Sequence, residues 1–171
     1  MLGYVTGKER GEADAVLAEV AAQLRRDGVA VAGVVQLNED FDPSRACHMD
    51  LHVLTGAEVV RISQNLGALS QGCRLDAAGL EQAVGLVAQA LAAGPDLLIV
   101  NKFGKQEADG RGFRPLIGQA MAAGIPVLTA VNPGSQAAFD LFADGLAVRL
   151  TCSHDEILRF CNDQLKGRQC Q

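Results

Sequence analysis

A run of large aliphatic residues in the second half of the chain is followed at once by polar side chains. Residues 97–100 are all apolar, and Asn101 and Lys102 come directly after them. An uninterrupted apolar run of this length is typical of a strand buried on both faces, in a parallel sheet that helices cover. Ligands of such sheets bind just beyond the carboxyl ends of the strands. We therefore expect any functional site close to Asn101, Lys102, Lys105 and Glu107.

Strand and helix patterns alternate along the rest of the chain. Short apolar runs predict strands at 2–5, 29–35, 125–131 and 146–150, and helical spacing of apolar residues predicts helices at 12–27, 76–93, 115–123, 136–142 and from 153 onward. The first strand, helix and second strand predict a right-handed parallel crossover. Alternating residues on both sides of Thr55-Gly56 predict an antiparallel hairpin inserted at about 46–63. This order indicates an α/β three-layer sandwich with a mostly parallel sheet of about five strands, formed by a single domain over residues 1–171.

Composition narrows the classes of function. The chain has 171 residues, with 15 Lys and Arg against 20 Asp and Glu, so a mild negative charge gives no electrostatic reason to bind nucleic acid or an anionic membrane. No apolar run approaches the roughly 20 residues of a membrane span, and the chain begins with a strand pattern instead of a signal peptide. We expect a cytoplasmic protein.

A glycine-bracketed turn follows the first predicted strand, where a phosphate-binding loop would lie. A working P-loop has two glycines five residues apart, then Lys and Ser or Thr. Here Gly7 and Gly11 are four residues apart, and Glu12-Ala13 follow them. The loop is therefore a degraded P-loop. Its free N–H groups, with Lys8 and Arg10, still predict a site for an anion, against the alternative of a plain tight turn.

The end of the apolar strand lacks the groups of a hydrolase. A phosphohydrolase of this type has an Asp that holds magnesium and a carboxylate that polarises water. Asn101 and Lys102 occupy these places, and neither acts as a base at neutral pH. If the protein is an enzyme, Glu107 is the candidate catalytic carboxylate.

Basic residues surround glycines after this strand. Lys102, Lys105 and Arg111 flank Gly104, and the amide of Asn132 follows the next predicted strand. We interpret this run either as a solvated loop or as a flap that binds phosphate or another oxyanion.

Two cysteines and two histidines raise a metal hypothesis. Cys47 and Cys73 would bind a soft metal, form a redox pair or fill the core, and the sequence leaves these alternatives open. His48 and His52 fall on one strand face with Asp50 between them. The two histidines would ligate a metal, or, because the sequence shows no third ligand, this face is a solvated polar face.

Several motifs resemble known families. After the apolar strand, Gly104, Lys105 and Glu107 match the strand end of the thermophile-type nucleoside-triphosphatase family. Nearly the whole chain is similar to a bacterial domain-of-unknown-function family, number 2478, with matching segments at 7–11, 47–51, 55–56, 62–67, 72–76, 101–107 and 131–133. The second resemblance implies a P-loop-type fold without an established activity and a link to molybdate transport.

Our leading hypothesis is a protein of P-loop-like fold that binds a nucleotide or an oxyanion with little or no hydrolase activity. The ligand-binding candidates are Gly7, Lys8, Arg10, Gly11, Asn101, Lys102, Gly104, Lys105, Arg111 and Asn132. The alternatives are an active nucleoside triphosphatase that uses Glu107, and a molybdenum-linked accessory protein that uses Cys47 and Cys73. We expect the cofactor to be a nucleotide with Mg²⁺ or an oxyanion, and the partner to be a small anionic ligand. The sequence leaves open whether the protein forms a homodimer.

Overall fold

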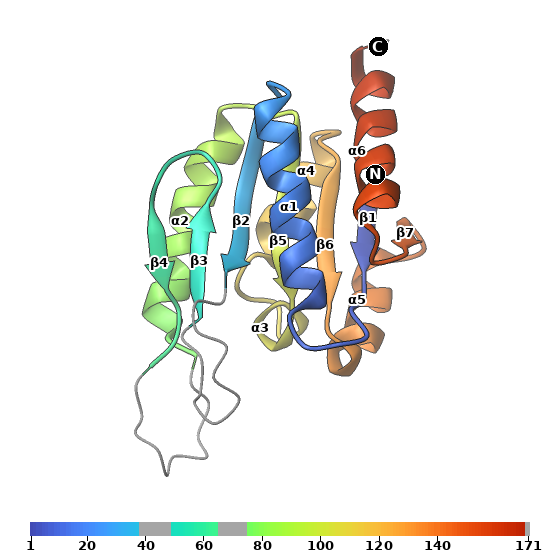
Figure 1. Cartoon of the computed structure of the whole chain (residues 1–171). Coiled ribbons are helices and arrows are strands. Elements are labelled where there is room, and N and C mark those ends of the chain that lie inside the picture. The colour runs from blue at the N-terminus through green and yellow to red at the C-terminus, as the bar shows by residue number, and fades with distance from the viewer. Residues whose placement is uncertain (38–48, 65–74, 170–171) are drawn as a thin grey trace.

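The described part of the chain forms a seven-stranded sheet covered by helices on both faces (Figure 1). The computed structural model describes residues 1–37, 49–64 and 75–169. In chain order the elements are β1 (Leu2–Val5), α1 (Glu12–Arg26), β2 (Val31–Leu37), β3 (Asp50–Val53), β4 (Val59–Arg61), α2 (Ala77–Ala92), β5 (Leu97–Phe103), α3 (Lys105–Ala108), α4 (Arg114–Ala122), β6 (Val127–Val131), the 3-10 turn η1 (Pro133–Ser135), α5 (Gln136–Ala143), β7 (Ala147–Leu150) and α6 (His154–Gln169). None of the described helices is long and apolar enough to cross a membrane.

The sheet has the strand order β4-β3-β2-β5-β6-β1-β7. Five neighbouring strands, β2, β5, β6, β1 and β7, are parallel to one another. Strands β3 and β4 run antiparallel and form a hairpin added beside β2. The predicted α/β class, the mostly parallel sheet and the inserted hairpin are thus confirmed. The chain passes from β1 through α1 to β2 across two intervening strands, β6 and β5, so these first two strands are parallel but are not neighbours.

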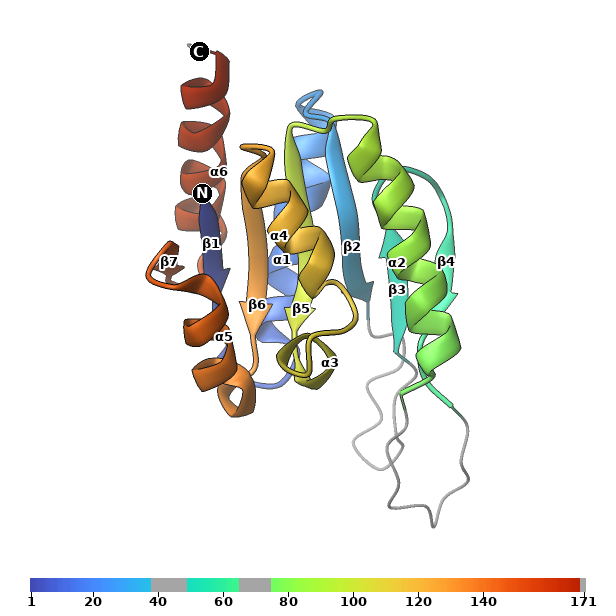
Figure 2. The same ribbon diagram turned by 180° about the vertical axis from the view of Figure 1, so that it is seen from behind.

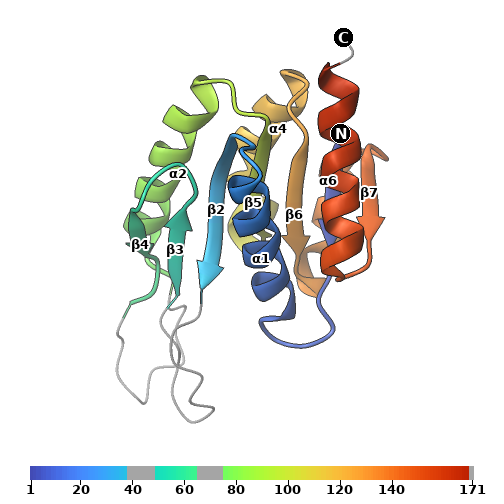
Figure 3. The ribbon, with the colours of Figure 1, turned by 45° about the horizontal axis from the view of Figure 1, so that its top comes forward.

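Two apolar layers lie on either side of the sheet. Helices α1 and α6 cover one face, with α6 against β1 and α1 nearer the middle strands (Figure 3). Helices α2, α4 and α5 cover the other face, as the view from behind shows (Figure 2). Strand β5 lies in the centre, and its residues 97–100 are completely buried, as the apolar run predicts.

Local sequence explains where the main helices begin and end. Gly11 precedes α1 with a positive φ of 82°, and Gly28 follows it with a φ of 83°, a conformation that glycine adopts without strain. The side chain of Asp76 accepts a hydrogen bond from the Ala78 N–H, as expected for the N-cap of α2. Ser153 and Glu156 have the sequence spacing of a capping box before α6. In the structure Glu156 accepts instead from the N–H and the hydroxyl of Thr151.

Candidate functional site

A pocket of about 440 Å³ opens at the carboxyl ends of the parallel strands, beside the turn that precedes α1. In Figure 1 these strand ends, this turn and α3 all lie at the lower end of the sheet. The lining residues come from five places in the sequence: Gly7, Lys8, Glu9, Arg10, Gly11, Ala13 and Asp14; Gln36; Met49; Lys102; and Ala130, Val131, Asn132 and Pro133. The amino-terminal glycine turn and the lysine that follows the central apolar run therefore line the same cavity.

The turn before α1 already holds one carboxylate of the protein. Glu12 Oε2 accepts hydrogen bonds from the N–H groups of Lys8 at 2.6 Å and of Glu9 at 3.2 Å. These two N–H groups hold the pKa of the Glu12 carboxyl below its usual range. Glu12 does not contribute to the wall of the pocket as the described residues form it. The first two donors of the degraded loop are thus taken by an internal anion that lies outside the cavity.

The first turn of α1 supplies further backbone N–H donors to the pocket. Ala13 and Asp14 belong to this turn and line the pocket. The first backbone N–H groups of an α-helix have no acceptor inside the helix, and they carry its positive dipole end. This end of α1 is therefore where the pocket wall is most favourable for an anion.

Lys102 reaches the pocket from the carboxyl end of β5. Its Nζ lies 3.4 Å from Asp14 Oδ1, and the two side chains are 30% and 8% exposed respectively. Strand β5 extends past the predicted apolar run to Phe103, which is why Lys102 is held on a strand and not on a loop. The pair fixes a cation beside the start of α1.

The charge of the wall is mixed. Lys8, Arg10 and Lys102 carry positive charges, and Glu9 and Asp14 carry negative ones. The formal balance of these five side chains is one positive charge, less than a uniformly basic wall would give. Favourable anion binding in this pocket would depend on the helix start and on the position of Lys102, and less on net charge.

Asn101 is buried beside this site without a partner. The residue is only 3% exposed, and both polar atoms of its side chain lack a hydrogen-bond partner among the described residues. Asn101 lies on β5 where the register of this strand against β6 shifts, between Val100 and Phe103, and it directly precedes Lys102. A buried amide without a partner is costly and calls for an explanation such as a water or a ligand group.

Glu107 is part of the structure of the loop after β5. Its Oε2 accepts from the Gly104 N–H at 2.9 Å, and its Oε1 accepts from the Phe113 N–H at 3.0 Å. Burial raises the pKa of this carboxyl above its usual range, and the two N–H groups oppose that rise. Glu107 lies outside the pocket wall formed by the described residues. A catalytic role for it stays a prediction, and the observed contacts are those of a carboxylate that fixes a loop.

Other predicted site residues also lie outside this wall. Gly104 is buried, whereas Lys105 and Arg111 are exposed. Arg111 pairs with Asp109 at 3.3 Å, and both side chains are largely open to solvent, so the pair contributes little to stability. Of the basic run after β5, Lys102 reaches the described wall of the pocket, and Lys105 and Arg111 do not.

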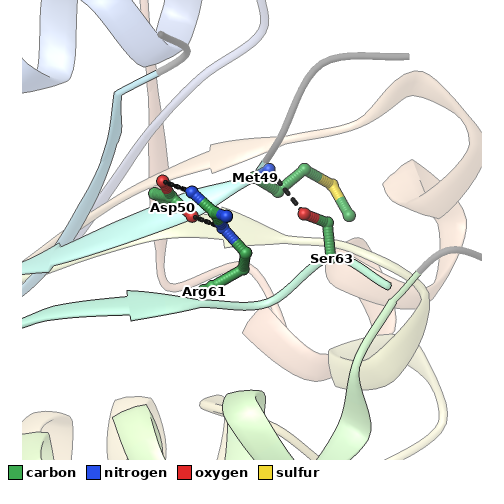
Figure 4. A network of polar contacts seen from close by, with 4 residues as sticks. All are labelled: Met49, Asp50, Arg61 and Ser63. Atoms are coloured by element: carbon green, nitrogen blue, oxygen red, sulfur yellow. Dashed lines mark hydrogen bonds and ion pairs between the residues drawn. The ribbon is translucent and has the colours of Figure 1, made fainter. Parts of the chain in front are cut away.

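The hairpin beside the pocket is joined by polar contacts (Figure 4). Arg61 donates from Nε and Nη2 to the two carboxylate oxygens of Asp50 at 2.9 and 3.0 Å, directly across the β3–β4 pair. The Met49 N–H donates to the Ser63 hydroxyl at 3.0 Å. Since Met49 also lines the pocket, these contacts help to hold that edge of the cavity.

The metal hypothesis rests on residues outside the described part of the chain. Cys47, Cys73 and His48 all lie there. Among the described residues, no group of three or more His, Cys, Asp and Glu side chains is arranged to hold a metal ion. Asp50 is engaged by Arg61.

Two buried polar residues of the pocket were not among the candidates from the sequence. Asp14 and Gln36 are both 6% exposed and line the cavity. Gln36 interrupts the apolar run of β2 close to its carboxyl end, and Asp14 lies within the first turn after the glycine turn. A search for polar residues at buried strand ends and first helical turns would have found both.

Comparison with known proteins identifies the family. The model of a family described as "Protein of unknown function (DUF2478)" matches residues 2–160. The chain belongs to this family. No solved structure matches this DUF2478 chain significantly.

A curated relative carries a name that describes a function. The chain is 40% identical over 157 residues to the protein named molybdenum import ATP-binding protein ModC 2 of Bradyrhizobium diazoefficiens. The match covers 91% of this chain but 17% of that relative. The DUF2478 chain thus corresponds to a small part of a much longer protein, and the relative's name describes the whole of it. The match is in keeping with a P-loop-like fold.

Proposed function

We propose that this DUF2478 protein binds the phosphate groups of a small, nucleotide-sized ligand in the pocket between the start of α1 and Lys102. The observation that carries the proposal is the convergence of the glycine turn, the first turn of α1 and Lys102 on one cavity. The volume of about 440 Å³ lies within the range of small-molecule sites, roughly 300–1,000 Å³. A single oxyanion would leave much of this space unfilled.

In this proposal each wall has a separate task. The N–H groups of Ala13 and Asp14 and the guanidinium of Arg10 face the phosphate groups, because a helix start and an arginine both favour tetrahedral anions. Lys102 supplies a cation from the end of β5, and the exposed Asn132 is available to the rest of the ligand.

The name of the curated relative supports a nucleotide as the ligand, since that protein is called an ATP-binding protein. Its link to molybdenum import makes molybdate the second ligand to test. Molybdate and phosphate are both tetrahedral oxyanions, so the same helix start would attract either one. The hydrolase alternative has less support, because both oxygens of Glu107 are engaged by backbone N–H groups.

Isothermal titration with ATP, GTP, inorganic phosphate and molybdate tests the proposal. We expect saturable binding of a nucleoside triphosphate that Lys102→Met weakens by roughly tenfold, because a charge-assisted contact worth about 1.4 kcal/mol is lost. Lys105→Met is the matched control: it removes the same charge from an exposed residue outside the described pocket wall, so the affinity should stay within about twofold.

Three outcomes contradict this assignment. Equal losses in the two variants would show that the basic run acts only through its general charge. Absence of nucleotide binding would remove the proposed function. Tight binding of molybdate without any binding of nucleotides would replace a phosphate ligand with an oxyanion ligand.

A further inference from the structure

The cation of a P-loop site is normally a magnesium ion with a defined set of oxygen donors. A hydroxyl after the loop lysine and a carboxylate at the end of a neighbouring strand hold the ion, which bridges the phosphate oxygens. In this chain Glu12-Ala13 follow the glycine turn, and Asn101-Lys102 end the apolar run of β5. The methyl group of Ala13 cannot ligate a cation, the amide of Asn101 has no charge to offset that of the ion, and the ammonium of Lys102 repels it. These residues therefore do not fit the magnesium ion of a P-loop site.

A different cation is built into the same space. Lys102 Nζ lies 3.4 Å from Asp14 Oδ1, and both residues line the pocket at the start of α1. Asp14 is almost completely buried, and a buried carboxylate is stable when an opposite charge accompanies it. Lys102 supplies that charge. A divalent ion that approached Asp14 would have to displace the ammonium or stay close to it, and both cost electrostatic free energy.

We propose that the Lys102 ammonium, positioned by Asp14, takes the place of a divalent cation, so that the pocket binds its phosphate ligand in the metal-free form. The inference rests on the proposed function and names the ionic form of the ligand. A metal-free polyphosphate carries more negative charge than its magnesium complex, and this charge favours direct pairing with Lys102 and with the helix start. Asp14 is a positioning residue, because it holds Lys102 and does not itself attract the anion.

Titration of the whole chain with ATP and GTP, once in excess Mg²⁺ and once in excess EDTA, tests this inference. The affinity in EDTA should equal or exceed the affinity in Mg²⁺. A requirement for Mg²⁺ would overturn the inference while leaving the proposed function intact. Absence of binding under both conditions would overturn the proposed function together with the inference, so the two failures are distinguishable.

Two variants test the Lys102–Asp14 pair through the Mg²⁺ dependence of the affinity, which would not change if the pair had only a structural role. In Lys102→Met the pocket loses the ammonium of Lys102, so affinity in EDTA should fall by roughly tenfold. Added Mg²⁺ should restore part of it, because Asp14 can then ligate the ion. In Lys102→Met with Asp14→Asn this restoration should disappear. Thermal unfolding of both variants separates lost folding from lost binding. If Mg²⁺ changes the affinity of Lys102→Met no more than that of the wild type, the proposal that Lys102 takes the place of a divalent cation is contradicted.

Discussion

Replacing Glu107 with alanine is expected to lower the free energy of unfolding by about 2–4 kcal/mol, because two buried N–H groups would lose a charged acceptor. The carboxylate of Glu107 accepts from Gly104 immediately after β5 and from Phe113 immediately before α4. It thereby closes the segment that contains α3 against the end of the central strand. Urea unfolding followed by circular dichroism measures the change.

Two further variants separate hydrogen bonding from charge. Glu107→Gln keeps the shape but offers one acceptor oxygen, so its stability should lie between the wild type and Glu107→Ala. Glu81→Ala removes a carboxylate from an exposed position on α2 and should change stability by less than about 0.5 kcal/mol. A Glu107→Ala protein as stable as the Glu81→Ala protein would mean that these two contacts do not hold the loop.

Gly33→Ala should destabilise the protein by about 3 kcal/mol or more, because the added methyl group has no space in the sheet. Gly33 lies on β2 with a φ of +118°, and a Cβ at this position would lie 1.8 Å from the carbonyl oxygen of Ile99 on β5. Since that oxygen belongs to the backbone of the neighbouring strand, relief requires the two central strands to separate. The midpoint of thermal or urea unfolding reports the effect.

Gly28→Ala is the matched control for this variant. Gly28 also has a positive φ of +83°, but no heavy atom lies within 4 Å of a Cβ built there. Its replacement should therefore cost only the backbone strain, about 1 kcal/mol. Similar losses in the two variants would show that backbone conformation matters at Gly33 and that the approach of Ile99 does not.

The fold could be predicted from the sequence because its signals are local and agree with one another. The apolar run at 97–100 indicated a strand buried on both faces, and the structure places it at the centre of the sheet. Asp76 and Gly28 mark helix ends by capping and by positive φ. The four-residue helix α3 was missed because a single turn is too short to show helical periodicity.

The site was only partly predictable, because its contacts join residues far apart in the sequence. Lys102 was a candidate from its place after the apolar run, but its partner Asp14 lies on another element. Glu107 was selected as a carboxylate near a strand end, and nothing in the sequence shows that both of its oxygens bind backbone N–H groups. Polar residues at a strand end thus indicate where a site lies, while their partners depend on the tertiary structure.

The most direct test of the account is a two-dimensional ¹H–¹⁵N NMR titration of the whole chain with ATP in EDTA. We expect the largest shifts at the amides of the lining residues Arg10, Gly11, Ala13, Asp14 and Lys102, and little change at Lys105 and Arg111. No shifts at saturating ATP, or shifts confined to residues away from the start of α1, would contradict a phosphate site in this pocket.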